Sequence, residues 1–389
     1  MKFTVGTNWQ KDLIPKIKKD SVRELYGKLA GDFIGGGRPA YISANPSKEE
    51  VYSHIKEVHQ NGMEFNYLLT AACLGNKEFT TSGQKKICQL LDWIVGMEVD
   101  SVTVAIPYLL QLIKKRYPRL KIYVSSFANV NTIERARYWE DLGANRITLD
   151  EFTLNRDFRL LRQIRNSVSC ELQLIANNGC LYNCPFVPYH GITISHSSQS
   201  EDNSGGFLLD YCVLNCKYLR ILNPVNFIRA DWIRPEDIHF YEDVGIDSMK
   251  LVDRTRPTEA IALVAEAYDK KEYNGNLMEL LPALSKDSFF SGGRKVWRGL
   301  KYFFHPFSIK PSFLHKLAKL NSKLYVYIDN SALDSFIEYF LERDCRSMSC
   351  KDCGYCEKVA RQVVKIEPVY QQKTVAKYKD VLNGLIYFK

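Results

Sequence analysis

The sequence predicts an α/β fold: a (β/α)8 barrel of the TIM type, with a cysteine-bearing insertion before the last strand and a small C-terminal extension. From residue 1 to about 270, short β-branched runs alternate with amphipathic helical stretches, and eight such pairs fit this length. Several runs are nearly all apolar, as in parallel strands buried on both faces. An open doubly wound sheet is the alternative. The sequence has neither a Gly-x-Gly-x-x-Gly after the first strand nor a Gly-x4-Gly-Lys-Ser/Thr.

The pattern places the individual elements. The strands are expected at Phe3–Thr7, Asp32–Gly35, Glu64–Leu69, Ser101–Ile106, Lys121–Ser125, Arg146–Leu149, Glu171–Ala176 and Asp247–Val252. The helices are expected at Ser47–Gln60, Gly83–Gly96, Tyr108–Tyr117, Thr132–Leu142, Asp157–Asn166, Pro235–Val244 and Thr258–Tyr268. Asn131 or Thr132, Asn155 and Pro235 stand where helix caps or first-turn residues belong. The run of glycines from Gly35 to Gly37 is interpreted as a turn or a close backbone approach.

The remaining segments interrupt this rhythm. Residues 1–270 would form the barrel, and residues 177–246 an unusually long connection within it, of a length that is usually functional. Residues 271–325 would form a basic and aromatic docking segment. Residues 326–389 would form a C-terminal subdomain, entered by a strand at Lys323–Ile328 and a helix at Ser331–Leu341.

Composition points to a globular protein of a reducing compartment. Of 389 residues, 46% are hydrophobic, which is enough for a sizeable core. No run of 18 apolar residues is present, and the N-terminus leads directly into a strand without a signal-peptide pattern. Clustered cysteines in such a chain favour metal thiolates over disulfides. We therefore expect a cytoplasmic location, with peripheral contact to the inner face of the membrane as a further option.

The positive charge is concentrated in one window. The chain carries a net charge of +9, and residues 286–323 alone hold nine Lys or Arg against one acid, Asp287. Basic residues among Phe and Trp suit an interfacial helix on anionic lipid, with Arg294–His305 as its centre. They are also compatible with an RNA phosphate track, or with a subdomain whose aromatic side chains pack inward. The three interpretations remain open.

Eight of the eleven cysteines fall into two tight groups. The first group is Cys180, Cys184, Cys212 and Cys216; the second is Cys345, Cys350, Cys353 and Cys356. The Cys-x2-Cys-x2-Cys spacing of the second group is typical of iron–sulfur ligation, whereas zinc prefers separated pairs of ligands. Zinc and plain thiols remain alternatives for both groups. The first group follows the seventh strand, at the end of a barrel where catalytic residues collect.

Candidate catalytic and binding residues surround the first group. His190 and His196 could donate a proton near neutral pH. Asp150 ends the sixth expected strand, and Asp231 precedes the eighth together with Arg229 and Arg234. Hydrogen-bonded loop histidines and a helix cap are the structural alternatives. A basic set could bind a carboxylated ligand through bidentate contacts, or could form salt bridges at the barrel rim: Arg229, Arg234, Lys250 and Arg254.

Two reaction types are disfavoured by the residues present. Radical S-adenosylmethionine chemistry needs Cys-x3-Cys-x2-Cys, and Val187 occupies the third position. Proteolysis lacks its usual motifs, because the chain has no His-Glu-x-x-His and no Gly-x-Ser-x-Gly.

The segment Asn177-Asn178-Gly179-Cys180-Leu181-Tyr182-Asn183-Cys184-Pro185, with His190 and His196-Ser197-Ser198-Gln199, resembles peptidase family U32, the collagenase-like peptidases. The stretch from Asp231 to Asp237, Tyr241-Glu242 and Lys250-Leu251 resembles the closing barrel segment of the same family. The resemblance implies a barrel carrying a [4Fe–4S] cluster on four cysteines. It also implies oxygen-independent hydroxylation, of ubiquinone precursors or of RNA bases, with prephenate linked to some of these reactions. The paired Cys-x3-Cys spacing and the second cysteine group depart from the family pattern.

Taken together, these features predict an iron–sulfur oxidoreductase that hydroxylates a small or lipid-like biosynthetic intermediate without oxygen. A [4Fe–4S] cluster on the first cysteine group would be catalytic, and a second one on the other group would supply its electrons. Prephenate is the expected oxygen donor. The expected partners are an electron-donor protein or sister subunit, and an anionic membrane surface that contacts residues 286–323. An RNA base-modifying enzyme and a non-catalytic electron-transfer subunit remain alternatives.

Overall fold

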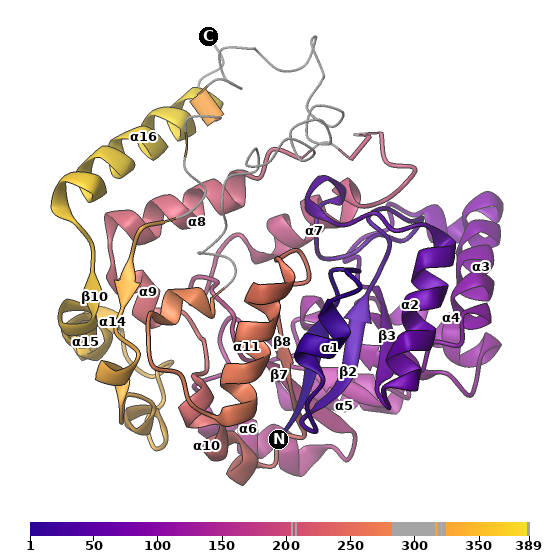
Figure 1. Ribbon diagram of the computed structural model, residues 1–389, viewed down its shortest axis with the longest axis horizontal. Helices are drawn as coiled ribbons and strands as arrows, with labels where there is room; N and C mark the ends of the chain where they lie inside the picture. Colours follow the sequence, from indigo (N-terminus) through magenta and orange to yellow (C-terminus); the bar gives the residue numbers. More distant parts are fainter. Residues whose placement is uncertain (204, 207, 282–315, 318–319, 321–323, 387–389) are drawn as a thin grey trace.

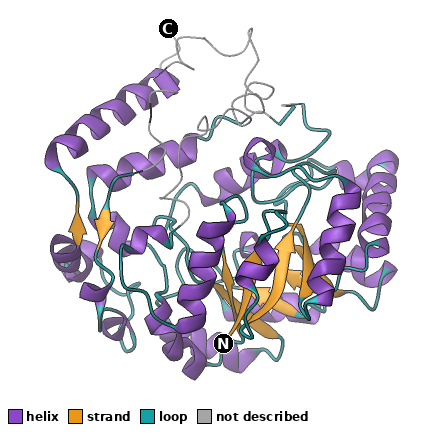
Figure 2. Ribbon diagram, viewed as in Figure 1, coloured by secondary structure: helices purple, strands orange, loops and turns teal. Residues whose placement is uncertain are grey.

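The chain forms a closed eight-stranded parallel barrel, as predicted (Figures 1 and 2). The computed structural model describes residues 1–203, 205–206, 208–281, 316–317, 320 and 324–386. β1 closes the barrel by pairing with β2 on one side and β8 on the other. The strands are β1 (Lys2–Gly6), β2 (Val22–Gly27), β3 (Glu64–Leu69), β4 (Ser101–Val104), β5 (Lys121–Val124), β6 (Arg146–Thr148), β7 (Glu171–Ile175) and β8 (Ser248–Leu251).

The predicted second strand was wrong. Asp32–Gly35 lies in a loop after β2, where Asp32 forms only an isolated bridge with Gln199. The true strand carries two charged residues, Arg23 and Glu24, and so lacks the apolar run that identifies its neighbours. Glu24 is buried because an arginine from across the barrel neutralises it. Its partner is far away in the sequence, so the strand cannot be recognised from local hydrophobicity.

Helices surround the barrel and cover the outer faces of its strands (Figure 1). Ser47 begins the second helix with a capping box that includes Glu50, and Thr132 caps the fifth helix as predicted. Asp157, rather than the predicted Asn155, caps the sixth. The helices of this layer are α1 (Leu13–Ile17), α2 (Lys48–Gln60), α3 (Thr81–Gly96), α4 (Pro107–Arg116), α5 (Ile133–Asp141), α6 (Phe158–Ser167), α10 (Ile238–Val244) and α11 (Thr258–Lys270). Short 3-10 turns are η1 (Ala40–Ile42), η2 (Lys77–Phe79), η3 (Ser126–Ala128), η4 (Pro235–Asp237) and η5 (Leu277–Glu279).

The interior of the barrel is polar. The side-chain amide of Gln173 donates to Thr4 Oγ1 at 3.0 Å and to Ser248 Oγ at 3.1 Å. Thr103 donates to Asn66 at 2.8 Å on the opposite wall. The apolar core lies between the strands and the helices, so most strand residues are buried on both sides. Because polar side chains fill the interior of the barrel, charged groups at the carboxyl ends of the strands can find hydrogen-bond partners there.

The long connection between β7 and β8 lies over the barrel. It contains α7 (Val187–Ser197), α8 (Tyr211–Leu222) and α9 (Val225–Arg229), and α7 lies beyond the carboxyl ends of β2 and β3 in Figure 1. The predicted close approach at the glycine run is confirmed. Gly35 has φ +83°, and a Cβ there would lie 2.7 Å from the carbonyl oxygen of Ser195 in α7. The Gly36 amide donates to Ser198 Oγ at 2.8 Å.

The C-terminal region returns to the barrel. α16 packs against α8, and α15 packs against α9 (Figure 1). The predicted helix at Ser331–Leu341 was wrong, because the chain forms two 3-10 turns there, and the described part of the predicted strand Lys323–Ile328 is extended only at its end. The elements are β9 (Tyr327–Ile328), η6 (Ser331–Leu333), η7 (Ile337–Phe340), α14 (Cys350–Cys353), α15 (Tyr355–Val363), β10 (Val364–Lys365) and α16 (Pro368–Ile386).

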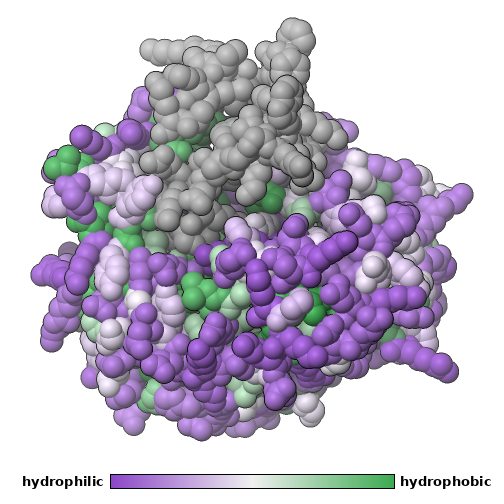
Figure 3. Space-filling view, viewed as in Figure 1, coloured by the Kyte–Doolittle hydropathy of each residue, from purple (hydrophilic) through white to green (hydrophobic). Residues whose placement is uncertain are grey.

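The predicted docking window, residues 286–323, lies almost entirely outside the described residues. Of its basic side chains, Lys316 is described, and it pairs with Asp380 of α16 at 2.9 Å. Within the described residues, no helix combines the length and the hydropathy needed to cross a bilayer. On the face seen in Figure 3, apolar side chains gather in small areas separated by hydrophilic ones.

Candidate functional site

Five charged side chains come together at the carboxyl end of the barrel. The Arg38 guanidinium lies 3.3 Å from the Asp253 carboxylate, joining the loop after β2 to the end of β8. Arg38 and Lys250 both interact electrostatically with Glu151, and Arg254 interacts with Arg38 and Asp253. We call these five residues the mouth cluster. Three cations and two acids give it an excess of positive charge, which suits an anionic ligand.

Burial controls the ionisation of the mouth cluster. It raises the pKa of Glu151 to about 7, against the opposing attraction of Arg38. It lowers the pKa of Lys250 to about 8, partly offset by Glu24 and Glu151. The Lys250 ammonium lies 4.1 Å from the ring centroid of Tyr26, inside the barrel. A carboxyl and an amine that both titrate near neutrality are the ordinary requirements for moving a proton at pH 7.

A second buried ion pair lies below the glycine run. Lys28 and Asp32 are 3.0 Å apart and almost fully buried, and the Tyr67 hydroxyl donates to Asp32 at 3.1 Å. Asp32 also accepts from the amides of Ile34 and Gly35 at 3.1 and 2.6 Å. These bonds fix the loop that carries Arg38 into the mouth cluster.

The first cysteine group borders the mouth cluster. Cys180 follows Asn178, whose side chain donates to the Glu151 carbonyl at 2.6 Å and accepts from the Cys180 amide at 2.8 Å. Cys184 precedes α7, and Cys212 and Cys216 lie one turn apart on α8. Burial raises the pKa of the Cys180 thiol, and the nearby Glu151, Cys216 and Cys184 add to this effect. Four thiols from two segments therefore share one region.

An arginine of α8 links these segments. Arg220 is fully buried, and its guanidinium donates to the sulfur of Cys216 and to the carbonyl oxygen of Gly179. Its Nε has no hydrogen-bond partner. Arg220 therefore connects the α8 cysteines to the segment that carries Cys180.

The second cysteine group lies on a short helix–turn–helix. Cys350 and Cys353 begin and end α14, which Ser349 caps, and Cys356 lies in the first turn of α15. Burial raises the pKa of the Cys345 thiol to about 12, and Cys356 and Cys353 contribute to the rise. The Cys356 thiol is similarly affected by Cys350 and Cys353. Cys345 and Cys356 each interact electrostatically with at least two other cysteines of the group, so the four thiols lie in one region.

Both groups suit a thiolate-bound metal by donor type and by spacing. Among the described residues, no three Cys, His, Asp or Glu side chains are arranged as a closed coordination site. Metal binding would therefore require rotation of the thiols and loss of their protons, as it does for thiolate sites in general. The ligand assignments remain predictions.

The predicted histidines each pair with a carboxylate. His190 lies 3.2 Å from Asp210, the N-cap of α8, and His196 lies 3.0 Å from Asp202. Both side chains are half-buried. Each pair orients its imidazole within the insertion that carries the first cysteine group, and a catalytic role for either stays a prediction.

The predicted carboxylates lie in different surroundings. Asp150 accepts from Thr153 Oγ1 at 2.5 Å and from the Phe152 amide at 3.2 Å, so it holds a local turn. Asp231 accepts from the Asn155 amide at 3.0 Å, and burial raises its pKa to about 7. The second oxygen of Asp231 has no hydrogen-bond partner. Electrostatic coupling with Cys345 places Asp231 beside the second cysteine group rather than in the mouth cluster.

The four predicted anion-binding residues do not form one set. Lys250 and Arg254 belong to the mouth cluster, whereas Arg229 acts electrostatically on Cys356. Arg234 binds Asp237 in a bidentate manner at 2.9 and 3.0 Å, and it donates to the Asn330 carbonyl at 2.8 Å. These contacts tie the C-terminal region to the barrel, which matches the salt-bridge alternative for Arg234.

Sequence reasoning missed three residues of these sites. Arg38 and Glu151 complete the mouth cluster, and Arg156 lies beside the second cysteine group. Glu151 is the second residue after the predicted sixth strand and could have been found by its position. Arg38 was hidden by the wrong placement of the second strand, and Arg156 carries no local signal.

A cavity of about 520 Å³ opens between the barrel rim and the second cysteine group. Its lining is mainly polar and includes two cysteines of that group and Tyr182, which lies between Cys180 and Cys184. The lining residues are Asn131, Thr153, Tyr182, Asn183, Cys345, Arg346, Met348, Ser349 and Cys350.

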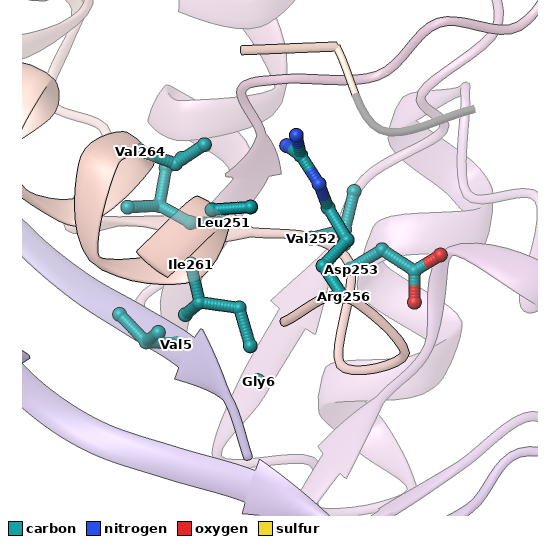
Figure 4. A pocket seen from close by; sticks show the side chains of 9 residues that line it. Val5, Gly6, Leu251, Val252, Asp253, Arg256, Ile261 and Val264 are labelled. Carbon is teal, nitrogen blue, oxygen red and sulfur yellow. The ribbon is translucent and has the colours of Figure 1, made fainter. Parts of the chain in front are cut away.

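A much smaller crevice of about 10 Å³ lies between β1, β8 and α11 (Figure 4). Val5, Ile261 and Val264 border it, while the Asp253 carboxylate points away from these apolar side chains. This volume is at the lower limit for one water molecule. The crevice is a packing gap and not a ligand site.

Comparisons with known proteins identify relatives of the chain. The profile described as peptidase family U32 matches residues 40–276. The uncharacterized protease MJ1657 of Methanocaldococcus jannaschii is 29% identical over 352 residues, covering 90% of this chain and 91% of that protein. The structure of the U32 peptidase Mk0906 is 23% identical, covering 64% of this chain and 92% of that chain with a TM-score of 0.48.

More distant matches carry a different description. The tRNA hydroxylation protein P1 of Bacillus subtilis is 20% identical over 190 residues, which are 44% of this chain and 42% of that protein. The tRNA hydroxylation protein P of Haemophilus influenzae is 22% identical over 138 residues, 34% of this chain and 29% of that protein. The match thus spans less than half of the length of either hydroxylation protein.

Proposed function

Because this chain belongs to peptidase family U32, we propose that it is an iron–sulfur enzyme that hydroxylates an organic substrate without molecular oxygen. The proposal rests mainly on one observation. The Asn178 side chain donates to the backbone carbonyl of Glu151 and accepts from the Cys180 amide, so Cys180 lies beside the mouth cluster. A redox centre on the first cysteine group would there lie beside a cluster of excess positive charge at the catalytic end of a barrel.

The mouth cluster suits a carboxylated oxygen donor, with prephenate as the proposed compound. Arg38, Lys250 and Arg254 supply three positive charges, and guanidinium groups bind carboxylates through paired hydrogen bonds. Lys250 lies inside the barrel, so a donor bound to it would be held at the barrel axis. Glu151 borders both the donor and Cys180, where it could accept a proton from the substrate.

The overall reaction balances without an external oxidant. A C–H bond of the substrate becomes C–OH, while a C–OH bond of the donor becomes C–H. The substrate loses two electrons and the donor gains two, with one hydrogen and one hydroxyl exchanged. An iron–sulfur cluster on the first cysteine group would supply a reversible electron store for this exchange.

A nucleoside in RNA is the favoured substrate over a lipid-like intermediate. Two relatives are named as tRNA hydroxylation proteins, although each match spans under half of their length. Nothing in the described residues favours the lipid-like intermediate in particular, since the basic window that suggested it lies almost wholly outside them.

Peptide hydrolysis is the weaker candidate, although one relative is named as a protease. A serine protease needs a hydroxyl that donates to an imidazole. The hydroxyls of Ser195, Ser197 and Ser198 instead donate to backbone carbonyls. His190 and His196 pair with aspartates, and neither receives one of these hydroxyl hydrogen bonds.

The test is a comparison of modified nucleosides after anaerobic expression. Total RNA from cells expressing the wild type, the Cys180→Ala/Cys184→Ala variant or a Cys88→Ala control would be digested and analysed by mass spectrometry. We expect a nucleoside heavier by one oxygen atom with the wild type and the control, and none with the double variant. An oxygen gain confined to small metabolites would favour the lipid-like substrate, and no oxygen gain in either fraction would contradict the hydroxylation proposal.

A further inference from the structure

We propose that the second cysteine group binds its own iron–sulfur cluster, and that Arg156 is the positioning residue that sets the reduction potential of this cluster. The inference goes beyond the proposed function, because it concerns a separate redox centre and is tested without any hydroxylation assay. It rests on the geometry around Arg156 and on the arrangement of the four cysteines.

The turn between the two helices brings the cysteines together. Gly354 ends α14 and begins α15 with φ +64°, a conformation that L-residues rarely adopt. No atom outside its own chain neighbours would lie within 4 Å of a Cβ at Gly354, so backbone conformation alone explains the glycine. The chain reverses there, which returns Cys356 to the side of Cys353 and Cys350. Cys345 approaches from the preceding loop.

Aromatic side chains form one wall of the site. Tyr339 stacks on Tyr355 with centroids 3.7 Å apart, and Phe336 also stacks on Tyr355, with centroids 5.6 Å apart. The Tyr339 hydroxyl lies 3.3 Å from the sulfur of Cys353. Iron–sulfur potentials respond to hydrogen bonds at sulfur, and the Tyr339 hydroxyl lies within hydrogen-bond distance of the Cys353 sulfur.

Arg156 lies beside the second cysteine group, and three aromatic rings surround its guanidinium. Its guanidinium carbon is 4.4 Å from the ring centroid of Trp232, 4.9 Å from Phe336 and 5.4 Å from Phe340. Two of its nitrogens donate to backbone carbonyls, of Ile228 at 2.7 Å and of Trp232 at 3.3 Å. Because these carbonyls are uncharged, they satisfy hydrogen bonds of the Arg156 guanidinium but do not neutralise its positive charge.

The charge of Arg156 is therefore incompletely compensated. Its side chain is 5% exposed, and its Nε has no hydrogen-bond partner. The nearest carboxylate, Asp231, is 3.9 Å away, and the facing oxygen of Asp231 has no hydrogen-bond partner either. A buried cation whose one ion pair is this long and makes no hydrogen bond is costly to keep.

Four thiolates around an iron–sulfur cluster would supply the missing negative charge. Arg156 packs on Phe336, which stacks on Tyr355, the residue before Cys356. Arg229, whose Nε also has no hydrogen-bond partner, lies on α9, which packs against the α15 helix that carries Cys356. An oxidised [4Fe–4S] core with four thiolates carries about two negative charges, and reduction adds one electron to it without making or breaking a bond. The arginine charge favours the reduced form and so raises the potential.

The test uses the full chain, purified without oxygen, in the Cys180→Ala/Cys184→Ala background that leaves only the second site. We expect about four irons and four sulfides per chain. Dithionite serves as the one-electron reductant in an EPR redox titration. Arg156→Gln should keep the iron and shift the potential to a more negative value, while Arg156→Lys should stay near the parent protein.

Two variants control for indirect effects. Arg159→Gln removes an exposed arginine that pairs with Asp344 at 3.0 Å, and it should leave the potential unchanged. If Arg156→Gln does not fold, Arg229→Gln should give a smaller shift in the same direction. Zinc in place of iron, iron that remains after Cys353→Ala/Cys356→Ala, or an unchanged potential in an iron-loaded Arg156→Gln protein would each overturn the inference.

Discussion

Arg146 on β6 and Glu24 on β2 face each other across the barrel, and Arg146 Nη1 donates to both carboxylate oxygens at 3.0 and 3.2 Å. Both side chains are about 1% exposed, and Arg146 also contacts Glu171 at 2.8 Å. The two strands are not neighbours in the sheet, so this ion pair joins opposite walls of the barrel.

We expect Arg146→Met to lower the free energy of unfolding by about 3–5 kcal/mol, because Glu24 would remain buried without its partner. The double variant Glu24→Leu/Arg146→Met should recover most of the loss, since no unpaired charge remains. Urea unfolding followed by circular dichroism measures both. Arg23→Met, which removes a half-buried arginine bound to Glu171, serves as the control and should have a smaller effect. A double variant as unstable as the single one would show that Arg146 acts mainly through packing.

The buried imidazole of His54 should make the protein less stable in mild acid. His54 bonds to Thr7 at 2.8 Å, and burial lowers its pKa from 6.5 to about 4. Since the unfolded chain takes up the proton first, stability is highest above pH 6.5 and falls as the pH drops toward 4. The expected loss between pH 7 and pH 5 is about 2 kcal/mol.

Urea unfolding at these two pH values measures the His54 contribution. His54→Gln should reduce the pH dependence by about 2 kcal/mol, whereas His239→Gln, at an exposed position, should retain it. An equal pH dependence in wild type and His54→Gln would assign the effect to other groups.

The pKa of Lys250 should be lower than that of the other exposed or half-exposed lysines. Burial lowers its pKa to about 8, so its amine is half neutral near that pH. Reductive dimethylation with ¹³C and NMR titration should reveal one lysine signal that moves near pH 8 and is missing in Lys250→Gln. Lys270→Gln, on the surface, should remove a different signal. If the signal lost in Lys250→Gln titrates near 10.5, Lys250 is more hydrated than its position indicates.

Gly35 should resist substitution for two separate reasons. Its φ of +83° disfavours any L-residue, and a Cβ would meet the Ser195 carbonyl at 2.7 Å. We expect Gly35→Ala to cost about 1–2 kcal/mol from the backbone and a further 1–3 kcal/mol from the clash. Gly62→Ala isolates the first term, because Gly62 has φ +74° and no atom within 4 Å of its Cβ position. Equal losses of thermal stability in the two variants would mean that α7 moves away without penalty.

The sequence identified most of the barrel because most of its strands are locally distinctive. Glu171–Ala176 and Glu64–Leu69 are apolar runs between helical stretches, and both correspond closely to observed strands. The strand Val22–Gly27 was missed because it contains the buried carboxylate of Glu24, and the partner of this carboxylate, Arg146, lies on the opposite wall of the barrel. The helix expected at Ser331–Leu341 failed for a related reason. Its Phe336 and Phe340 pack around Arg156 and Tyr355, and these tertiary contacts accompany 3-10 turns in place of a regular helix.

Strand periodicity and cysteine spacing are local properties of the chain, so the (β/α)8 barrel, the two groups of four cysteines and the position of the first group after the seventh strand could all be predicted from the sequence. Which charged residues act together depends on the fold. It separated Arg234 from Lys250 and Arg254, brought Arg38 and Glu151 to the barrel mouth, and placed Arg156 beside the second cysteine group. Electrostatic partners are set by distance in space, and in a closed barrel residues more than a hundred positions apart become neighbours.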